Sequence, residues 1–448
     1  MRSSSSLPQI SWLTKTPVIS VALMLLLSLT VPLRCFAYAV LSHEAIIDTV
    51  WDTNLKPLLL ARFPNATPDE LRQAHGYSYG GAIIQDMGYY PHGTHFFSDL
   101  THYVRSGDFI IALLRDSKDL NGYAFALGSL AHYASDNDGH KLGTNRAVPL
   151  LYPKLKVKFG PSVTYEQDPL AHVKTEFGFD VIEVAQHRYA PDSYHDFIGF
   201  QVAVPLLEQA FQETYGLTLK TVLPNEEQTL NSYRHAVSQQ LPKATRIAWS
   251  LKRKEIQKDM PGITKKKFLY NLSRASYEKE WGKKYEQPTF GEKFLGFITK
   301  LLPKIGPLRV LQFRAPTPQT EKMFEESFNA TLVRYKVLIA QVGNETATAS
   351  GHLELINDNF DTGEVTPPGK YRLNDDTYAK LLDKLADERF LGASPELRAD
   401  IQHFFADPNA PYAIKRDPKA WAKVQADLEQ LKSAPLAPFT AQSTSALQ

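Results

Sequence analysis

Cysteine is almost absent from this sequence: its 448 residues contain one, Cys35. Disulfide bonds within the chain are therefore excluded. An excess of charge of one sign is lacking too, because 50 basic residues stand against 48 acidic ones, which gives no overall attraction to nucleic acid or to a membrane. Alternation of polar and apolar residues is scarce and internal repeats are missing, which argues against a β-sheet protein or a solenoid.

The N-terminus carries an apolar run over residues 18–33, preceded by basic residues. Residues 35–37 end in a small residue, so the layout is typical of a signal peptide over 1–37. We expect an exported protein, periplasmic or secreted, whose mature chain begins at Tyr38 and has no thiol. If the signal were not cleaved, it would act as a membrane anchor, although the apolar run is short for a spanning helix.

Helical periodicity dominates the remaining sequence and predicts an all-α fold of many helices. Ser42 is expected to cap the first helix, and Asp417 followed by Pro418 is expected to start the last. Helices are expected near residues 42–51, 68–74, 98–116, 119–137, 170–188, 200–213, 228–257, 321–342, 375–388, 396–404 and 418–432.

Two folded parts are expected: a helical catalytic domain over 38–345 and a C-terminal helical extension over 346–433, with a disordered tail over 434–448. Within the first part, residues 252–313 are rich in lysine and arginine. Residues 292–305 have apolar side chains at helical spacing with lysines between them, which is typical of a peripheral membrane contact. A solvated helical hairpin is the alternative.

Histidine is concentrated in one part of the chain, because ten of the 13 histidines lie within residues 43–195. In the strongest segment, His132 and Asp136 are four residues apart and would share one helix face. Gly139 is expected to end this helix, so that His140 turns back from a loop.

A second pair, His172 and Glu176, repeats the four-residue spacing on the next predicted helix. Imidazole and carboxylate side chains at this spacing are suited to binding zinc. One such pair is weak evidence, whereas two pairs and a further histidine indicate a metal site.

With these motifs the chain resembles the zinc-dependent phospholipase C family, whose helical fold is shared with fungal single-strand-specific nucleases. The resemblance covers residues 38–190 by motif and the helices up to about 345 more loosely. Tyr38 followed by His43 resembles the family's N-terminal opening, in which the amine and carbonyl of an aromatic residue bind zinc. Asp86 and the segment His95-Phe96-Phe97 resemble the next part of the motif.

The resemblance implies three zinc ions and a role for Asp86 in orienting or deprotonating water. The implied ligands are Asp86, His95, His132 and Asp136 for the first ion, Tyr38, His43 and a bridging Asp136 for the second, and His140, His172 and Glu176 for the third. Surface or capping positions are expected for His75, His92, His102, Asp138, His187 and His195. His92 and His102 are nevertheless the alternatives to His95 as a ligand, because both are close to it and His102, seven residues on, could share its helix face.

The resemblance implies a phospholipase C that releases a phosphorylated head group from phospholipid. A single-strand nuclease or 3'-nucleotidase on the same cluster is the first alternative; Glu176 favours the lipase and the short Tyr38–His43 spacing favours the nuclease. An envelope protein that binds zinc without catalysis is the second. A Gly-x-Ser-x-Gly motif at 76–80 matches the nucleophile elbow of α/β-hydrolases, but a polar helix and not a strand is expected before it.

Overall fold

The computed structural model describes residues 40–90, 92–185, 201–235, 313–347 and 353–435. The predicted signal peptide, Tyr38, nearly all of the basic segment, His187, His195 and the end of the C-terminal tail lie outside these ranges. Within them the chain is helical and has no sheet, so the prediction of an all-α fold is confirmed. No helix in these ranges combines the length and apolar character that crossing a membrane requires.

Each helix predicted within the described ranges has a counterpart, whereas the helices at 56–62, 145–151, 153–159 and 219–222 were not predicted. The predicted ends at residues 188 and 257 lie outside the described residues. The α-helices are α2 (Val40–Val50), α3 (Lys56–Arg62), α4 (Pro68–Ile83), α5 (His95–Tyr103), α6 (Ser106–Asp116), α7 (Leu120–Asp138), α8 (Asn145–Leu151), α9 (Pro153–Phe159), α10 (Pro169–Ala185), α12 (Val204–Tyr215), α13 (Leu219–Val222), α14 (Glu226–His235), α19 (Pro318–Ala347), α20 (Arg372–Asp387), α21 (Pro395–Phe404) and α22 (Pro418–Ser433). The π-helical turns are η1 (Trp51–Leu55) and η3 (Gly139–Thr144), and the 3₁₀ turns are η2 (Ile84–Tyr89) and η6 (Ala413–Arg416).

Two local predictions were wrong and one is confirmed. The single helix expected over 98–116 is α5 and α6, which separate at Arg105, where the backbone is left-handed with φ of 48°. Ser42 lies inside α2 and does not cap it; its hydroxyl donates to the Asp180 carboxylate at 2.8 Å. Asp417 caps α22 as predicted, because its side chain accepts hydrogen bonds from two backbone amides.

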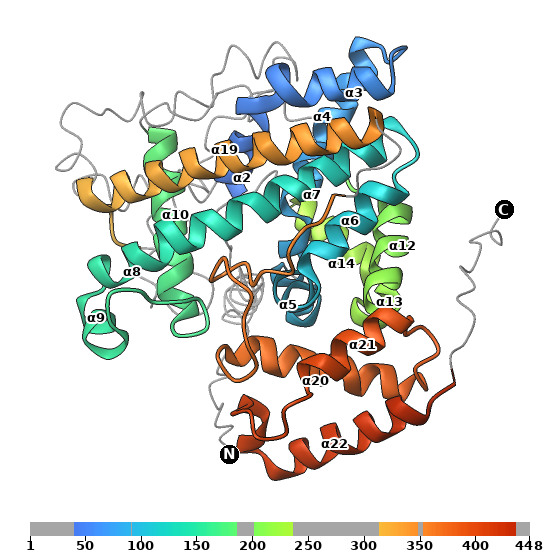
Figure 1. Cartoon of the computed structure of the whole chain (residues 1–448). Helices are drawn as coiled ribbons and strands as arrows, with labels where there is room; N and C mark the ends of the chain where they lie inside the picture. Colours follow the sequence, from blue (N-terminus) through green and yellow to red (C-terminus); the bar gives the residue numbers. More distant parts are fainter. Residues whose placement is uncertain (1–39, 91, 186–200, 236–312, 348–352, 436–448) are drawn as a thin grey trace, which may run out of the picture.

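Helix α7 runs through the middle of the molecule, with α4 and α19 packed against it (Figure 1). The crossing of α4 and α7 is close because glycines face backbone atoms there. A Cβ atom on Gly81 would lie 1.9 Å from the carbonyl oxygen of Phe125, and one on Gly128 would lie 2.0 Å from that of Ser78. The tight crossing brings the end of α4, and the turn η2 that follows it, beside the middle of α7.

The Gly-x-Ser-x-Gly motif lies entirely within α4, so it forms no nucleophile elbow. The Ser78 hydroxyl is buried and donates to the carbonyl oxygen of Ala124 at 3.1 Å. The motif therefore serves helix packing.

Helices α20, α21 and α22 form a layer beyond α5, and the stretch 353–371 before them returns to the side of α7 (Figure 1). Ser106 donates to the carbonyl oxygen of Asp358 at 2.6 Å, and the Tyr133 hydroxyl donates to that of Ile356 at 3.0 Å. These bonds hold the stretch 353–371 against α6 and α7.

The Gly128→Ala variant is expected to lower the free energy of unfolding by about 1–3 kcal/mol, because the added methyl group meets backbone and cannot be relieved by a rotamer change. Gly122→Ala is the matched control in the same helix, since its Cβ would meet only side-chain atoms at 3.4 Å or more. The control should match or slightly exceed the wild type, because alanine favours helix. Urea denaturation compares them; equal stability of the two variants would contradict the close crossing.

Candidate metal centre

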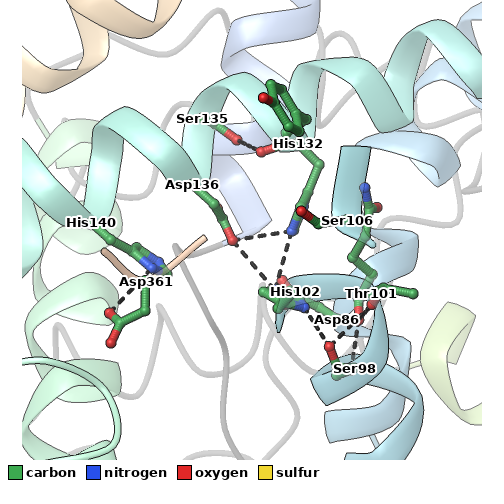
Figure 2. Close-up of polar contacts among 12 residues, drawn as sticks. Asp86, Ser98, Thr101, His102, Ser106, His132, Ser135, Asp136, His140 and Asp361 are labelled. Carbon is green, nitrogen blue, oxygen red and sulfur yellow. Dashed lines mark hydrogen bonds and ion pairs between the residues drawn. The ribbon is translucent and has the colours of Figure 1, made fainter. Parts of the chain in front are cut away.

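Three of the predicted site residues follow one another at intervals of four residues along one continuous helical segment. His132 and Asp136 are on α7, and His140 is in the π-helical turn η3, which continues into α8. Gly139 does not end the helix as predicted, because it keeps a right-handed helical conformation and its N–H bonds back to Ser135 and Asp136. The wide π turn therefore keeps His140 on the face that carries His132 and Asp136, where Figure 2 shows all three side chains.

The first group of potential metal ligands surrounds one oxygen of Asp136. His132 Nε2 is 3.1 Å from Asp136 Oδ2, and His102 Nε2 is 3.4 Å from the same atom. His102 Nε2 is also 3.3 Å from Oδ1 of Asp86, which the turn η2 places opposite α5. Donor atoms of Asp86, His102 and His132 lie close enough together to hold one ion.

Backbone carbonyl groups orient the two imidazole rings of this group. His102 Nδ1 lies 2.7 Å from the carbonyl oxygen of Ser98, and His132 Nδ1 lies 2.9 Å from that of Ala82. Because a carbonyl can only accept, each Nδ1 carries a proton, which leaves Nε2 as the nitrogen atom that faces the carboxylates. This outer arrangement is typical of histidines that bind a metal.

The second group shares residues with the first. His43 Nε2 is 3.5 Å from Oδ1 of Asp136, and the His43 ring stacks on that of His132 at 4.5 Å between centroids. The Ser135 hydroxyl lies 2.8 Å from His43 Nδ1 and fixes the ring. Since the two Asp136 oxygens face different histidines, this carboxylate lies where a bridge between two ions would lie. Tyr38, the other predicted ligand, is outside the described residues.

The third group consists of two histidines and two carboxylates. Glu176 Oε1 is 3.3 Å from His140 Nε2 and 3.0 Å from His172 Nδ1. Asp361 Oδ1 is 3.6 Å from His140 Nδ1 and 3.4 Å from His172 Nε2. Donor atoms of His140, His172 and Asp361 are near enough to one another to hold an ion. Glu176 contacts both rings through their other nitrogen atoms.

The structure brings His102, and not His95, into the first group, which corrects the sequence-based choice. His95 is the exposed first residue of α5, and its ring packs beside Tyr89 at 5.3 Å. His102 lies seven residues on, two turns into the buried end of α5, and so reaches α7. The surface position expected for His102 was therefore wrong. His92 is exposed, and His75 pairs with Asp48 at 3.0 Å away from the site.

Asp361 was missed altogether. It lies in a short turn between Asn359 and Glu364, which the sequence marks only as polar. It is 189 residues from His172 and on no helix, so no helical spacing connects it with the other ligands. Only the three-dimensional fold places it in the site (Figure 2).

The site has an excess of buried acceptor atoms. Its carboxylate-bearing residues, Asp86, Asp136, Glu176 and Asp361, are at most 2% exposed. Asp86 Oδ1, both oxygens of Asp136 and of Glu176, and Asp361 Oδ1 have no hydrogen-bond donor among the described residues. Buried carboxylates without donors are costly unless a cation compensates them. Nitrogen and oxygen donors around each position fit zinc.

The pKa values of the histidines reflect this excess of negative charge. Burial lowers the pKa of His102, but the negative charges of the nearby Asp136 and Asp86 carboxylates outweigh it and raise the pKa to about 10. Burial and the neighbouring His132 instead lower the pKa of His43 well below its usual range, which leaves His43 neutral with a lone pair for a ligand. Burial raises the pKa of Asp136, but the charges of His132 and other histidines hold it well below its usual range.

Residues 42–225 match the model of the family described as Zinc dependent phospholipase C. No curated protein and no protein of known structure gives a significant match to the chain. Over this segment the chain is similar to that family, which is a family of hydrolases. The segment contains every described residue of the three groups except Asp361.

Replacing His102 by Ala removes a direct ligand and should strongly reduce the affinity of the protein for zinc. The loss should exceed that caused by removing an outer-shell partner, which is about 10–100-fold. His95→Ala, in the same helix, should leave the affinity unchanged. Competition with a chelator, followed by metal analysis, measures both. A loss of zinc from the His95 variant alone would restore the sequence-based assignment.

Proposed function

We propose that the chain, which is similar to the zinc-dependent phospholipase C family over residues 42–225, hydrolyses the phosphodiester bond of phospholipids and releases a phosphorylated head group. The observation that carries the proposal is the position of Asp136, buried between His43 on one side and His102 and His132 on the other. Paired metal sites that share a carboxylate are suited to phosphodiester hydrolysis.

The first and second groups share Asp136 and together form the paired site. Each of its residues has a distinct task in the proposal. Asp136 would bridge two zinc ions, and His43, His102 and His132 would hold them. Asp86 borders this position, with Oδ1 lacking a donor among the described residues. Asp86 is therefore placed to accept a proton from the attacking water or to orient it. Bound zinc ions supply Lewis acidity, which activates that water and stabilises the negative charge of the phosphate.

Phospholipid is the preferred substrate because the matched family is a phospholipase family. The basic segment 252–313, and residues 292–305 within it, provide the lysines and apolar side chains that a peripheral contact with a lipid surface uses. Export is the third part of the proposal, and it rests on the signal-like layout of residues 1–37.

Purified mature protein should release phosphocholine from phosphatidylcholine vesicles in a zinc-dependent reaction and should leave single-stranded DNA intact when both substrates are offered in parallel. Chelation should abolish turnover and added zinc should restore it. Cleavage of DNA alone would assign the chain to the nuclease alternative. Zinc binding with turnover of neither substrate would overturn the proposal in favour of a zinc-binding protein without catalysis.

The Asp136→Asn variant should lose two zinc ions together and about 100-fold or more in kcat/KM, because it removes a charge shared by both ions while preserving shape. Asp138→Asn is the matched control, two residues along the same helix, where the carboxylate pairs with Arg334 at 3.3 Å. Metal analysis and lipid turnover compare them. If Asp136→Asn kept a full complement of zinc, the carboxylate would not be a bridge.

The proposed export predicts the first residue of the mature chain. Protein recovered from the periplasm or the medium should begin at Tyr38, because the predicted cleavage follows Ala37. Its free amine would then be available as a ligand near His43. N-terminal sequencing tests this, and any other first residue would remove Tyr38 from the ligand set.

A further inference from the structure

Asp361 belongs to the part of the chain that the family match does not reach, yet its side chain lies in the third group. It is 1% exposed and more than 100 residues beyond the matched segment 42–225. Its Oδ1 atom is 3.4 Å from His172 and 3.6 Å from His140. Figure 2 shows Asp361 directed at His140 from the stretch that precedes α20.

The Asp361 carboxylate is held in one orientation by its other oxygen. Oδ2 accepts a hydrogen bond from the Tyr371 hydroxyl at 2.8 Å and one from the backbone N–H of Tyr165 at 2.8 Å. Both bonds leave Oδ1 facing the two imidazole rings, and Oδ1 has no hydrogen-bond donor among the described residues. One half of the carboxylate is thus saturated by the protein, and the other half is presented to the site.

The backbone around Asp361 is fixed as firmly as its side chain. The Asn359 side-chain oxygen accepts the N–H of Asp361 at 2.9 Å, and the Asn145 amide donates to the Asp361 carbonyl at 2.6 Å. Gly363 adopts a positive φ of 64°, and a Cβ there would lie 2.2 Å from the carbonyl oxygen of Asn137. The turn is therefore shaped to seat Asp361 against the end of α7 before any ion arrives.

Phe360 fastens the same turn to the paired site. Its N–H donates to the carbonyl oxygen of His102 at 3.1 Å, and its ring lies 5.3 Å from that of His102 and 5.9 Å from that of His132. Two consecutive residues of this turn thus contact the paired site and the third group, respectively.

Donor atoms of His140, His172 and Asp361 lie near enough to one another to hold one ion, and imidazole and carboxylate donors suit zinc. Glu176 faces the opposite nitrogen atoms of both rings, and the side-chain oxygen of Asn145 lies 2.8 Å from His172 Nε2 on the Asp361 side. We propose that Asp361 is a ligand of the third zinc ion together with His140 and His172, on the side of their rings opposite to Glu176.

The proposal rests on the zinc site of the proposed function, but it does not depend on which substrate is hydrolysed. The third ion would fasten the stretch 353–371 to η3 and α10, and its binding energy would stabilise that arrangement.

The test measures zinc per chain in the Asp361→Asn variant under competition with a graded chelator. We expect two tightly held ions, with the affinity for the third reduced about 10-fold or more, because an amide is a much weaker zinc ligand than a carboxylate. Glu364→Gln is the matched control in the same turn, since that carboxylate pairs with Lys141 at 2.7 Å and is 67% exposed. Three ions held with wild-type affinity by Asp361→Asn would overturn the proposal.

A second variant gives a direct spectroscopic readout and covers the case in which Asp361→Asn does not fold. Asp361→Cys places a thiolate at this position, and Cys35→Ser removes the only other cysteine. Loading the double variant with Co²⁺ should produce a thiolate-to-cobalt charge-transfer band, which the Cys35→Ser protein lacks. Cobalt bound at three ions per chain without that band would refute ligation at position 361.

The two proposals fail in different ways. Wild-type protein that binds no zinc would overturn the proposed function and the third centre together. Wild-type protein that binds three ions and hydrolyses lipid, with an unaltered third ion in Asp361→Asn, would overturn only the role of Asp361.

Discussion

The structure depends on the compensation of carboxylates buried in the middle of a helical bundle. Asp136 is fully buried and its two oxygens have no hydrogen-bond donors among the described residues. A buried ion that is not paired costs several kcal/mol, so the helices that meet at Asp136 come together stably only when positive charge is supplied there. Because the pKa of His102 is raised to about 10, a proton on this ring supplies part of the positive charge, and zinc ions would supply it in full.

Much of the fold and about half of the site follow from local sequence. Pairs such as His132 and Asp136 are visible because helical spacing alone puts them on one face, and long amphipathic helices are visible for the same reason. His102 was only an alternative to His95, because the choice between them depends on which end of α5 faces α7. Asp361 could not be recognised, because a turn has no periodicity and its contacts lie far away in the sequence. The π turn at Gly139 was hidden as well, since glycine normally suggests that a helix ends.

The glycine-lined crossing of α4 and α7 links packing to chemistry. It draws the turn η2 close enough to α7 for Asp86 to face the His102 that also contacts Asp136. The stretch 353–371 then packs over the other side, with Phe360 against the paired site and Asp361 against the third group. The family segment thus contributes the paired site by itself, whereas the third group is completed by the C-terminal part of the chain.

Anomalous diffraction at the zinc absorption edge, from crystals of the purified protein grown without chelator, tests the metal cluster most directly. We predict two neighbouring zinc peaks that share Asp136, and a third peak in contact with His140, His172 and Asp361. Absence of zinc at Asp136, with its carboxylate paired to protonated histidines instead, would contradict the metal cluster on which the proposed hydrolysis depends.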